Sequence, residues 1–167
     1  STEGAGDTRF SLRRALGIAP HHRMLLLAAG LRRIKDPAHL LDAVGAWHAR
    51  DPRVHLVVVG DALEPDHADA VLARIARTPG VHHHPSLSRG RFLAAVRDAD
   101  LVVNTSHDEG MNGVLLEAMH LGTPVIARRN AGNASLVPHG ETGMLYDTPD
   151  DLVATAHALP HDGALDP

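Results

Sequence analysis

The sequence contains no cysteine in its 167 residues and few aromatic side chains. Without cysteine the chain has no disulfide, no thiolate metal site and no cysteine nucleophile, and such a composition is compatible with a reducing, cytoplasmic location. Two Phe, one Tyr and one Trp offer little surface for stacking against nucleobases. On composition, nucleic acid is therefore not an expected partner.

Positive charge and long apolar runs are also scarce. A formal net charge of −4 provides no basic surface for a phosphate backbone. No apolar run approaches the roughly 18 residues that cross a bilayer, and the first residues lack the apolar core of a signal peptide. No Gly-x-Gly-x-x-Gly follows an apolar run, which argues against a dinucleotide-dependent dehydrogenase. We therefore expect a cytoplasmic protein without a transmembrane segment.

Short apolar runs alternate with helical patterns along most of the chain. The continuous runs at 24–30 and 54–60 are typical of parallel strands buried on both faces. Weaker signals predict strands at 81–84, 101–103, 124–127 and 143–146. Two helices are predicted to start at N-caps, one at Asp36 and one at Ser88, and another is predicted to end near Gly122. Two further helices are predicted over about 67–77 and about 150–159. This alternation predicts an α/β fold, a Rossmann-like, doubly wound parallel sheet of about six strands flanked by helices.

The length fits one domain, which we expect to comprise residues 1–167 with a lead-in segment at 1–20. Gly30, Gly60, Thr105 and Arg128 fall at or just after predicted strands. Ligands of open parallel sheets bind beyond the carboxyl ends of the strands, so these positions should converge on one site.

The segment 104–123 carries the strongest signal for that site. A predicted strand runs through a glycine-containing turn into a helix, whose free first-turn N–H groups and positive dipole end attract anions. Glu109 and Glu117 stand eight residues apart, about two helical turns at ~3.6 residues each. With Glu109 at the cap, Glu117 would lie on the same side. An anion site flanked by two carboxylates that can accept hydroxyls suits a nucleotide sugar.

This segment resembles the Glu-x7-Glu signature of the retaining group 1 (family 4) glycosyltransferases. Residues 30–37 (Gly-Leu-Arg-Arg-Ile-Lys-Asp-Pro) are similar to that family's phosphate-binding turn, and 132–143 are similar to its later conserved loop and Gly-x-Thr-Gly turn. The matches lie in the family's order, and the resemblance covers about 24–158. Members have a GT-B fold with an acceptor-binding and a donor-binding half. The resemblance implies one half of that fold, the donor-binding domain, with the N-terminal acceptor-binding domain absent.

The resemblance also implies roles for single residues. Lys35 would neutralise the diphosphate leaving group together with Arg33 or Arg32, of which we favour Arg33. Glu109 would position the donor sugar and Glu117 would accept the ribose hydroxyls. The backbone of 110–114 would bind the distal phosphate, and the loop at Leu87 would meet the nucleobase. The candidate catalytic residues are Lys35, Arg33 and Glu109; the candidate donor-binding residues are Arg32, Gly110, Met111, Asn112, Gly113, Val114, Glu117, Leu87 and Asn133. No metal or other cofactor is expected.

Three positions depart from the family pattern. The common Glu-Gly-Phe-Gly-Leu-Pro reads Glu-Gly-Met-Asn-Gly-Val here, the family's arginine position is Gly30, and a glutamate of its later loop is Ser135. Backbone donation to phosphate survives these changes, and Asn133 or Ser135 can still bond a ligand. The identities of the base and the sugar stay open.

The expected function is transfer of a sugar from a nucleoside-diphosphate sugar to an acceptor hydroxyl with retention of configuration. The isolated chain should have little or no activity. The alternatives are a non-catalytic nucleotide-sugar-binding module and a GT-B relative such as a sugar-nucleotide epimerase. His82 and His84 would share a strand face, but no carboxylate lies at ligand spacing, so we predict no metal site there.

Overall fold

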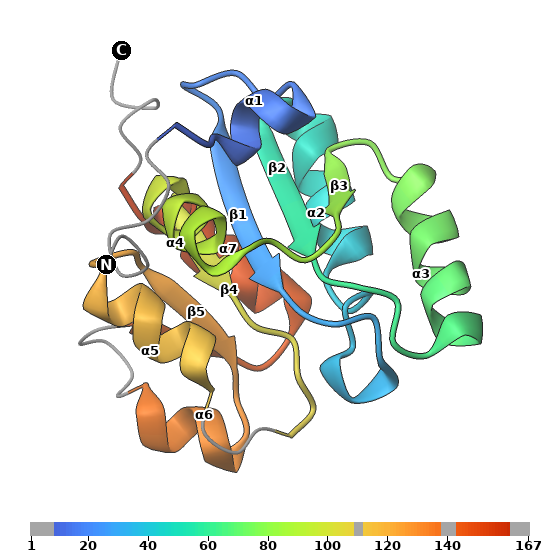
Figure 1. The fold of residues 1–167 in the computed structure, drawn as a ribbon. Coiled ribbons are helices and arrows are strands. Elements are labelled where there is room, and N and C mark those ends of the chain that lie inside the picture. Colours follow the sequence, from blue (N-terminus) through green and yellow to red (C-terminus); the bar gives the residue numbers. More distant parts are fainter. Residues whose placement is uncertain (1–8, 109–111, 138–142, 161–167) are drawn as a thin grey trace.

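Six parallel strands form one sheet at the centre of the molecule (Figure 1). The computed structural model describes residues 9–108, 112–137 and 143–160. The strands are β1 (Arg23–Ala28), β2 (Val54–Val59), β3 (Val81–His84), β4 (Leu101–Val103), β5 (Val125–Arg128) and β6 (Gly143–Tyr146). Their order is β3-β2-β1-β4-β5-β6, and every pairing is parallel. The prediction of a Rossmann-like parallel sheet of about six strands is confirmed.

Helices cover both faces of this sheet. One layer contains α2 (Leu41–Arg50), α3 (Pro65–Ala76) and α7 (Pro149–Ala158), and the other contains α1 (Leu12–Leu16), α4 (Arg89–Asp98) and α5 (Gly113–His120). A short helix α6 (Ala131–Leu136) follows β5, and a 3₁₀ turn η2 (Arg33–Lys35) follows β1. Because crossovers between parallel strands are right-handed, the reversal of direction after β3 places α5 on the face opposite α2 and α3. No helix of the described ranges is long and apolar enough to cross a membrane.

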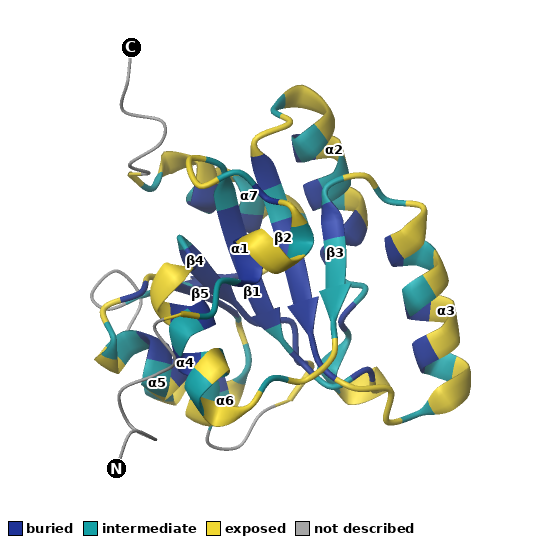
Figure 2. Cartoon of the chain, turned by 45° about the horizontal axis from the view of Figure 1, so that its top comes forward, coloured by how far each residue is buried: buried dark blue, intermediate teal, exposed yellow. Residues whose placement is uncertain are grey.

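The central strands are buried between the two helical layers (Figure 2). Successive residues of β1 alternate between two core clusters: Leu25 and Leu27 pack toward α2 and α3, and Met24 and Leu26 pack toward α1, α4 and α5. A strand with apolar neighbours on both faces needs an unbroken apolar run, which is the pattern that the sequence shows.

Two helix boundaries differ from the prediction. Asp36 does not cap a helix: it has φ 47° and ψ 53° in the left-handed region, where it ends η2, and α2 begins only at Leu41. Tertiary contacts of the Asp36 carboxylate, described below, favour this conformation over a local cap. In addition, α3 begins at Pro65, before the predicted start near 67, since proline suits the first turn of a helix.

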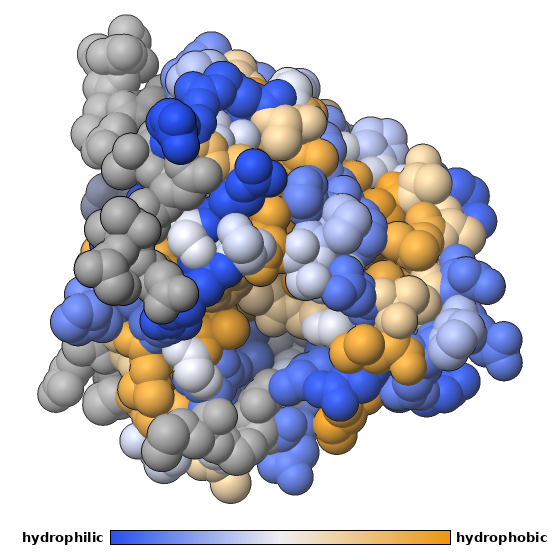
Figure 3. Space-filling view, in the orientation of Figure 1, coloured by the Kyte–Doolittle hydropathy of each residue, from blue (hydrophilic) through white to orange (hydrophobic). Residues whose placement is uncertain are grey.

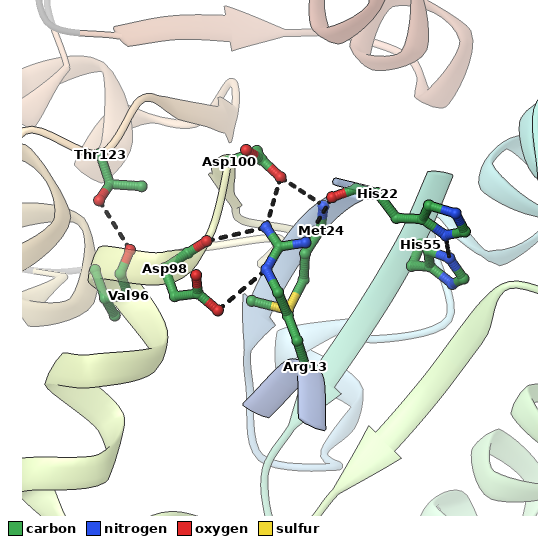
Figure 4. A network of polar contacts seen from close by, with 8 residues as sticks. All are labelled: Arg13, His22, Met24, His55, Val96, Asp98, Asp100 and Thr123. Carbon is green, nitrogen blue, oxygen red and sulfur yellow. Dashed lines mark hydrogen bonds and ion pairs between the residues drawn. The ribbon is translucent and has the colours of Figure 1, made fainter. Parts of the chain in front are cut away.

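The lead-in segment is attached to the amino edge of the sheet through Arg13 (Figure 4). This residue of α1 is buried, and its side chain is 8% exposed. Its guanidinium donates to Asp98 Oδ2 at 3.1 Å, Asp100 Oδ2 at 2.8 Å and the His22 carbonyl at 2.5 Å. Asp100 Oδ2 also accepts the Met24 N–H at 2.8 Å. One buried arginine therefore joins α1 to the end of α4 and the start of β1.

Three histidines line the same edge beside this network. His22 Nδ1 lies 3.0 Å from His55 Nε2, and His55 Nδ1 lies 3.0 Å from His82 Nε2. Burial, followed by the neighbouring His82, lowers the pKa of His55 to about 4, so the row is neutral at pH 7. Neutral imidazoles can donate from one nitrogen and accept at the other, which allows them to bond in a chain.

Candidate functional site

A cavity of about 340 Å³ opens at the carboxyl ends of β1 and β2. In the space-filling view a hollow is visible on this face beside the end of β1 (Figure 3). Its walls come from the ends of the two strands and from the segments that follow β1 and β3; the lining residues are Ala28, Ala29, Gly30, Lys35, Val59, Gly60, Asp61, Leu63, Ser86, Leu87 and Phe92. The topology brings Gly30, Gly60, Lys35 and Leu87 together at this cavity, whereas Thr105 and Arg128 are not among its lining residues.

At the base of the cavity, the backbone at Gly60 lies against the backbone at Ala29, and this close approach leaves no room for a side chain at position 60. A Cβ at this position would lie 2.0 Å from the Ala29 carbonyl oxygen. The two segments stay paired beyond the strands, through a parallel bridge between Leu31 and Ala62. The tight spacing of this edge thus depends on the absence of a side chain at position 60.

Lys35 ends the η2 turn and lines the cavity. It is the only lysine in the sequence, where every other long basic side chain is an arginine. The backbone on either side of it is bonded to the segment after β4, because Thr105 Oγ1 donates to the Lys35 carbonyl at 2.6 Å and the His107 N–H donates to the Ile34 carbonyl at 3.1 Å. The predicted phosphate lysine is therefore held at the cavity wall by its main chain.

The two arginines that precede Lys35 differ in their surroundings. Arg33 Nη1 lies 2.6 Å from Glu64 Oε2, and the Arg33 N–H donates to Glu64 Oε1 at 3.1 Å. The side chain of Arg33 is 70% exposed, and its guanidinium pairs with Glu64 at the start of α3. Arg32 is exposed, and its Nε would lie 3.9 Å from a Cβ on Gly30, at the cavity rim. This placement favours Arg32 over Arg33 for a phosphate contact, a choice that the sequence left nearly even.

The N-cap of α5 is Asn112, so the arrangement considered from the sequence, with Glu109 at the cap, does not apply. Asn112 Oδ1 accepts the N–H groups of Val114 at 3.1 Å and Leu115 at 3.3 Å. Asparagine is among the preferred N-cap residues because its short side chain reaches these donors, and glutamate is not. Of the step from 109 to 117, the helix includes the residues from Gly113 onward. Glu109, Gly110 and Met111 lie outside the described residues, so the roles predicted for them stay predictions.

The remaining predicted residues of this helix lie on its first two turns. Gly113 is its first residue, and a Cβ there would meet no described atom within 4 Å. Glu117 lies one turn further on and is 27% exposed in its side chain. Its Oε1 lies 2.7 Å from Arg89 Nη1 at the start of α4. Arg89 was not anticipated; its position two residues after Leu87 is the only signal in the sequence.

The loop at Leu87 is held by a carboxylate from the neighbouring strand. Asp61, just after β2, accepts the Ser86 N–H at 3.0 Å and the Ser86 hydroxyl at 2.6 Å. These two hydrogen bonds, the hydroxyl first, lower the pKa of Asp61. The predicted base-binding loop is thus tied to the end of β2 on the cavity side.

Asn133 lies beneath the site, where it has no exposed surface. Its Nδ2 donates to Asn104 Oδ1 at 2.7 Å and to the Arg128 carbonyl at 2.9 Å. Tyr146, whose pKa is raised by burial, donates its hydroxyl to the Asn104 carbonyl at 2.8 Å. A direct ligand contact of Asn133 stays a prediction, and its position favours support of the ends of β4 and β5. The segment around it, which resembles a loop of the family, is the helix α6.

The described part of the chain contains no group of side chains that could serve as metal ligands. Within 9–108, 112–137 and 143–160, no three His, Asp or Glu side chains are grouped so that they could hold an ion. His82 bonds to His55, and His83 bonds to the Gly60 carbonyl at 2.7 Å. The first of these lies at the amino edge, away from the cavity.

The strand order defines a Rossmann-like domain, and its cavity lies at the carboxyl ends of β1 and β2, where ligands of this fold class bind. A family model described as glycosyl transferases group 1 matches residues 22–162. The chain belongs to this family of glycosyltransferases, and its sheet matches one half of the GT-B fold.

Curated relatives support the same assignment. The chain is 33% identical to glycosyltransferase 1 domain-containing protein 1 of Xenopus tropicalis over 139 residues, which is 83% of this chain and 40% of the relative. It is 34% identical to the D-inositol 3-phosphate glycosyltransferase of Corynebacterium glutamicum over 146 residues, which is 81% of this chain and 34% of that protein. The chain thus spans less than half the length of these two relatives.

Solved structures share the fold. Anabaena Alr3699/HepE in complex with UDP and glucose has a TM-score of 0.75 and 30% identity, over 87% of this chain and 40% of that chain. The C-terminal domain of a glycosyl transferase group 1 family protein (LpcC) from Francisella tularensis has a TM-score of 0.67, over 86% of this chain and 76% of that chain. At 18% identity the second likeness concerns the fold alone.

Proposed function

We propose that this chain is the donor-binding domain of a retaining glycosyltransferase and that it binds a nucleoside-diphosphate sugar at the carboxyl edge of its sheet. The observation that carries the proposal is the convergence of Lys35, Gly30, Gly60 and Leu87 on one cavity. The Alr3699/HepE structures, which contain UDP, UDP-glucose, or UDP and glucose, support it by their likeness to this chain.

In the proposed reaction an acceptor hydroxyl attacks the anomeric carbon on the same face as that from which the leaving group departs. The bond from this carbon to the diphosphate oxygen breaks, and the hydroxyl proton passes to the departing nucleoside diphosphate. Negative charge grows on the diphosphate in the transition state, so cations and N–H dipoles fixed beside it lower the barrier. Lys35 and the amino end of α5 would supply this stabilisation, with Arg32 or Arg33 as a further contact and Glu109 positioning the sugar.

The nucleoside would lie between α5 and the loop at Leu87. Glu117 would accept the ribose hydroxyls, with Arg89 holding its carboxylate at 2.7 Å. The loop tied to Asp61 would face the base through its backbone. We propose no metal cofactor; in this scheme Lys35, Arg32 or Arg33 and backbone N–H donors stabilise the charge of the diphosphate.

The whole reaction would also need an acceptor-binding domain in the same protein. The chain spans 40% and 34% of the two relatives named above. We expect the donor domain alone to bind the nucleotide weakly and to turn over little substrate, and we propose a cytoplasmic setting for the complete enzyme.

Calorimetry of the chain with UDP, GDP and ADP and their common sugar conjugates, without added metal, tests this function. We expect saturable binding of one base, weakened about 10- to 100-fold in Lys35→Met, because a hydrogen bond to a charged group contributes about 1.5–3 kcal/mol. Arg77→Met removes an exposed positive charge at the end of α3 and serves as the matched control. Equal affinities of the two variants would refute the role of Lys35.

A further inference from the structure

Asp36, the residue after Lys35, has an unusual backbone conformation that its side chain explains. Among the described residues it is the only non-glycine with positive φ, at 47°. Glycine adopts this conformation without strain, and aspartate tolerates it better than most residues but less well than glycine. The carboxylate of Asp36 must therefore make contacts that offset the strained backbone.

Those contacts reach two segments that are distant in the sequence and one nearby histidine. Asp36 Oδ2 lies 2.9 Å from Arg128 Nη1 at the end of β5, 3.1 Å from His107 Nε2 after β4, and 3.7 Å from His39 Nδ1 before α2. The side chains of Asp36 and Arg128 are only 25% and 20% exposed. Arg128 Nη1 also donates to the Thr105 carbonyl at 3.0 Å. One carboxylate thus joins the η2 turn to the ends of β4 and β5.

The contacts of the Asp36 side chain hold the turn on the carboxyl side of Lys35. Backbone contacts of Ile34 and Lys35 hold the other part of the turn. Thr105 is fully buried and bonds the Lys35 carbonyl, and His107 bonds the Ile34 carbonyl. The turn and the segment that leads toward α5 are therefore bonded at three successive residues. A shift of Lys35 relative to that segment would break several hydrogen bonds together.

We propose that Asp36 and Arg128 form a positioning pair that holds the Lys35 turn against the segment before α5 and so places the ammonium group for the diphosphate of the donor. The inference rests on the proposed function of Lys35. In this arrangement the lysine is held beside residues 105–107, although the two segments belong to different βα units. Neither Asp36 nor Arg128 contacts the diphosphate itself.

The single lysine gives a direct readout of its own position. Reductive methylation with ¹³C-formaldehyde keeps its charge and labels only Lys35 and the chain's terminal amine, and Lys35→Arg assigns the two signals. We would compare Asp36→Gly, Arg128→Gln and the double variant. Asp36→Gly removes the carboxylate but suits the positive φ, so it should fold. The control is Arg129→Gln, which breaks the neighbouring ion pair of Arg129 with Asp147 (2.9 Å) at the exposed surface.

We expect Asp36→Gly and Arg128→Gln each to move the Lys35 signal and to weaken binding of UDP, GDP or ADP about tenfold. The double variant should lose no more than either single variant, because the two residues act as a pair. Arg129→Gln should change neither readout. An unchanged Lys35 signal in both single variants would overturn the proposal, even if their melting temperatures fall, since the pair would then serve stability alone.

The same experiment separates this inference from the proposed function. If the wild-type chain binds UDP, GDP or ADP and loses this binding in Lys35→Met, the proposed function stands whatever the Asp36 variants do. If the wild-type chain binds none of the three, the proposed function is refuted. The proposal that Asp36 and Arg128 place the Lys35 ammonium group for a diphosphate is then refuted as well.

Discussion

At the amino edge of the sheet, charged and polar side chains bind one another, whereas at the carboxyl edge they surround a cavity. Arg13 is buried among acceptors from α4 and the start of β1, and His55 bonds to histidines on both sides. At the other edge, Lys35 and Leu87 border a hollow of about 340 Å³. Both edges consist of strand ends in one parallel sheet. The difference is the one expected if the amino edge contributes stability and the carboxyl edge carries the proposed ligand site.

The largest effect should follow from removing the arginine at the amino edge. Arg13→Ala removes the cation that pairs with both Asp98 and Asp100, and we expect it to lower the free energy of unfolding by about 3 kcal/mol. Urea denaturation followed by circular dichroism measures this loss. Arg14→Ala, on the same helix but exposed, should cost less than about 1 kcal/mol. A similar small loss in Arg13→Ala would contradict the assignment of stability to this edge.

A second prediction concerns backbone spacing at the carboxyl edge. Gly60→Ala places a Cβ against the Ala29 carbonyl, so we expect a loss of about 2 kcal/mol and a displaced β2 end. Gly113→Ala adds a Cβ that meets no described atom within 4 Å, and it should change stability by less than about 0.5 kcal/mol. Thermal and urea denaturation of the two variants make the comparison. Equal stability would show that the strand ends can separate without cost.

The third prediction separates binding from stability at the carboxyl edge. Glu117→Gln should weaken nucleoside diphosphate binding about tenfold while unfolding changes by less than about 1 kcal/mol, since Arg89 is 63% exposed and such pairs contribute little. Asp147→Asn breaks an exposed ion pair of similar length with Arg129 and serves as the control. Calorimetry and melting curves test both. Unchanged affinity with a lower melting temperature would make Glu117 a structural residue.

The smallest effect should be a pH dependence that belongs to the amino edge. The pKa of His55 is about 4 in the fold, against 6.5 for an ordinary histidine, through burial and through His82, His22, His48 and Arg13. The unfolded chain then binds more protons at this group between these values, so stability falls as the pH drops from about 6.5 to about 4.

The corresponding measurement compares unfolding free energies at about pH 7 and about pH 5. His55→Gln should reduce the difference between them by about 1 kcal/mol, a figure discounted because the ring is only half-buried. His120→Gln removes an exposed histidine of α5 and should leave the difference unchanged. An identical pH dependence in His55→Gln and the wild type would show that the histidine row does not resist protonation.

Local pattern in the sequence was enough to determine the fold class and most of the sheet. The apolar runs at 24–30 and 54–60 predict β1 and β2 because a strand covered on both faces must be apolar throughout. The rule that ligands bind at the carboxyl ends of parallel strands explains why Gly30 and Gly60 could be expected to lie together, whereas Lys35 and Leu87 were expected there from the family resemblance.

Only the tertiary structure decided which groups are partners. Asp36 looks locally like an N-cap, but Arg128, 92 residues away, holds it in a left-handed turn. Arg13 meets Asp100 across 87 residues, and Glu117 meets Arg89 from another helix. Such pairs depend on how the right-handed crossovers place distant strand ends side by side. Periodicity reports the face that a residue occupies, and the packed fold alone determines what lies opposite that face.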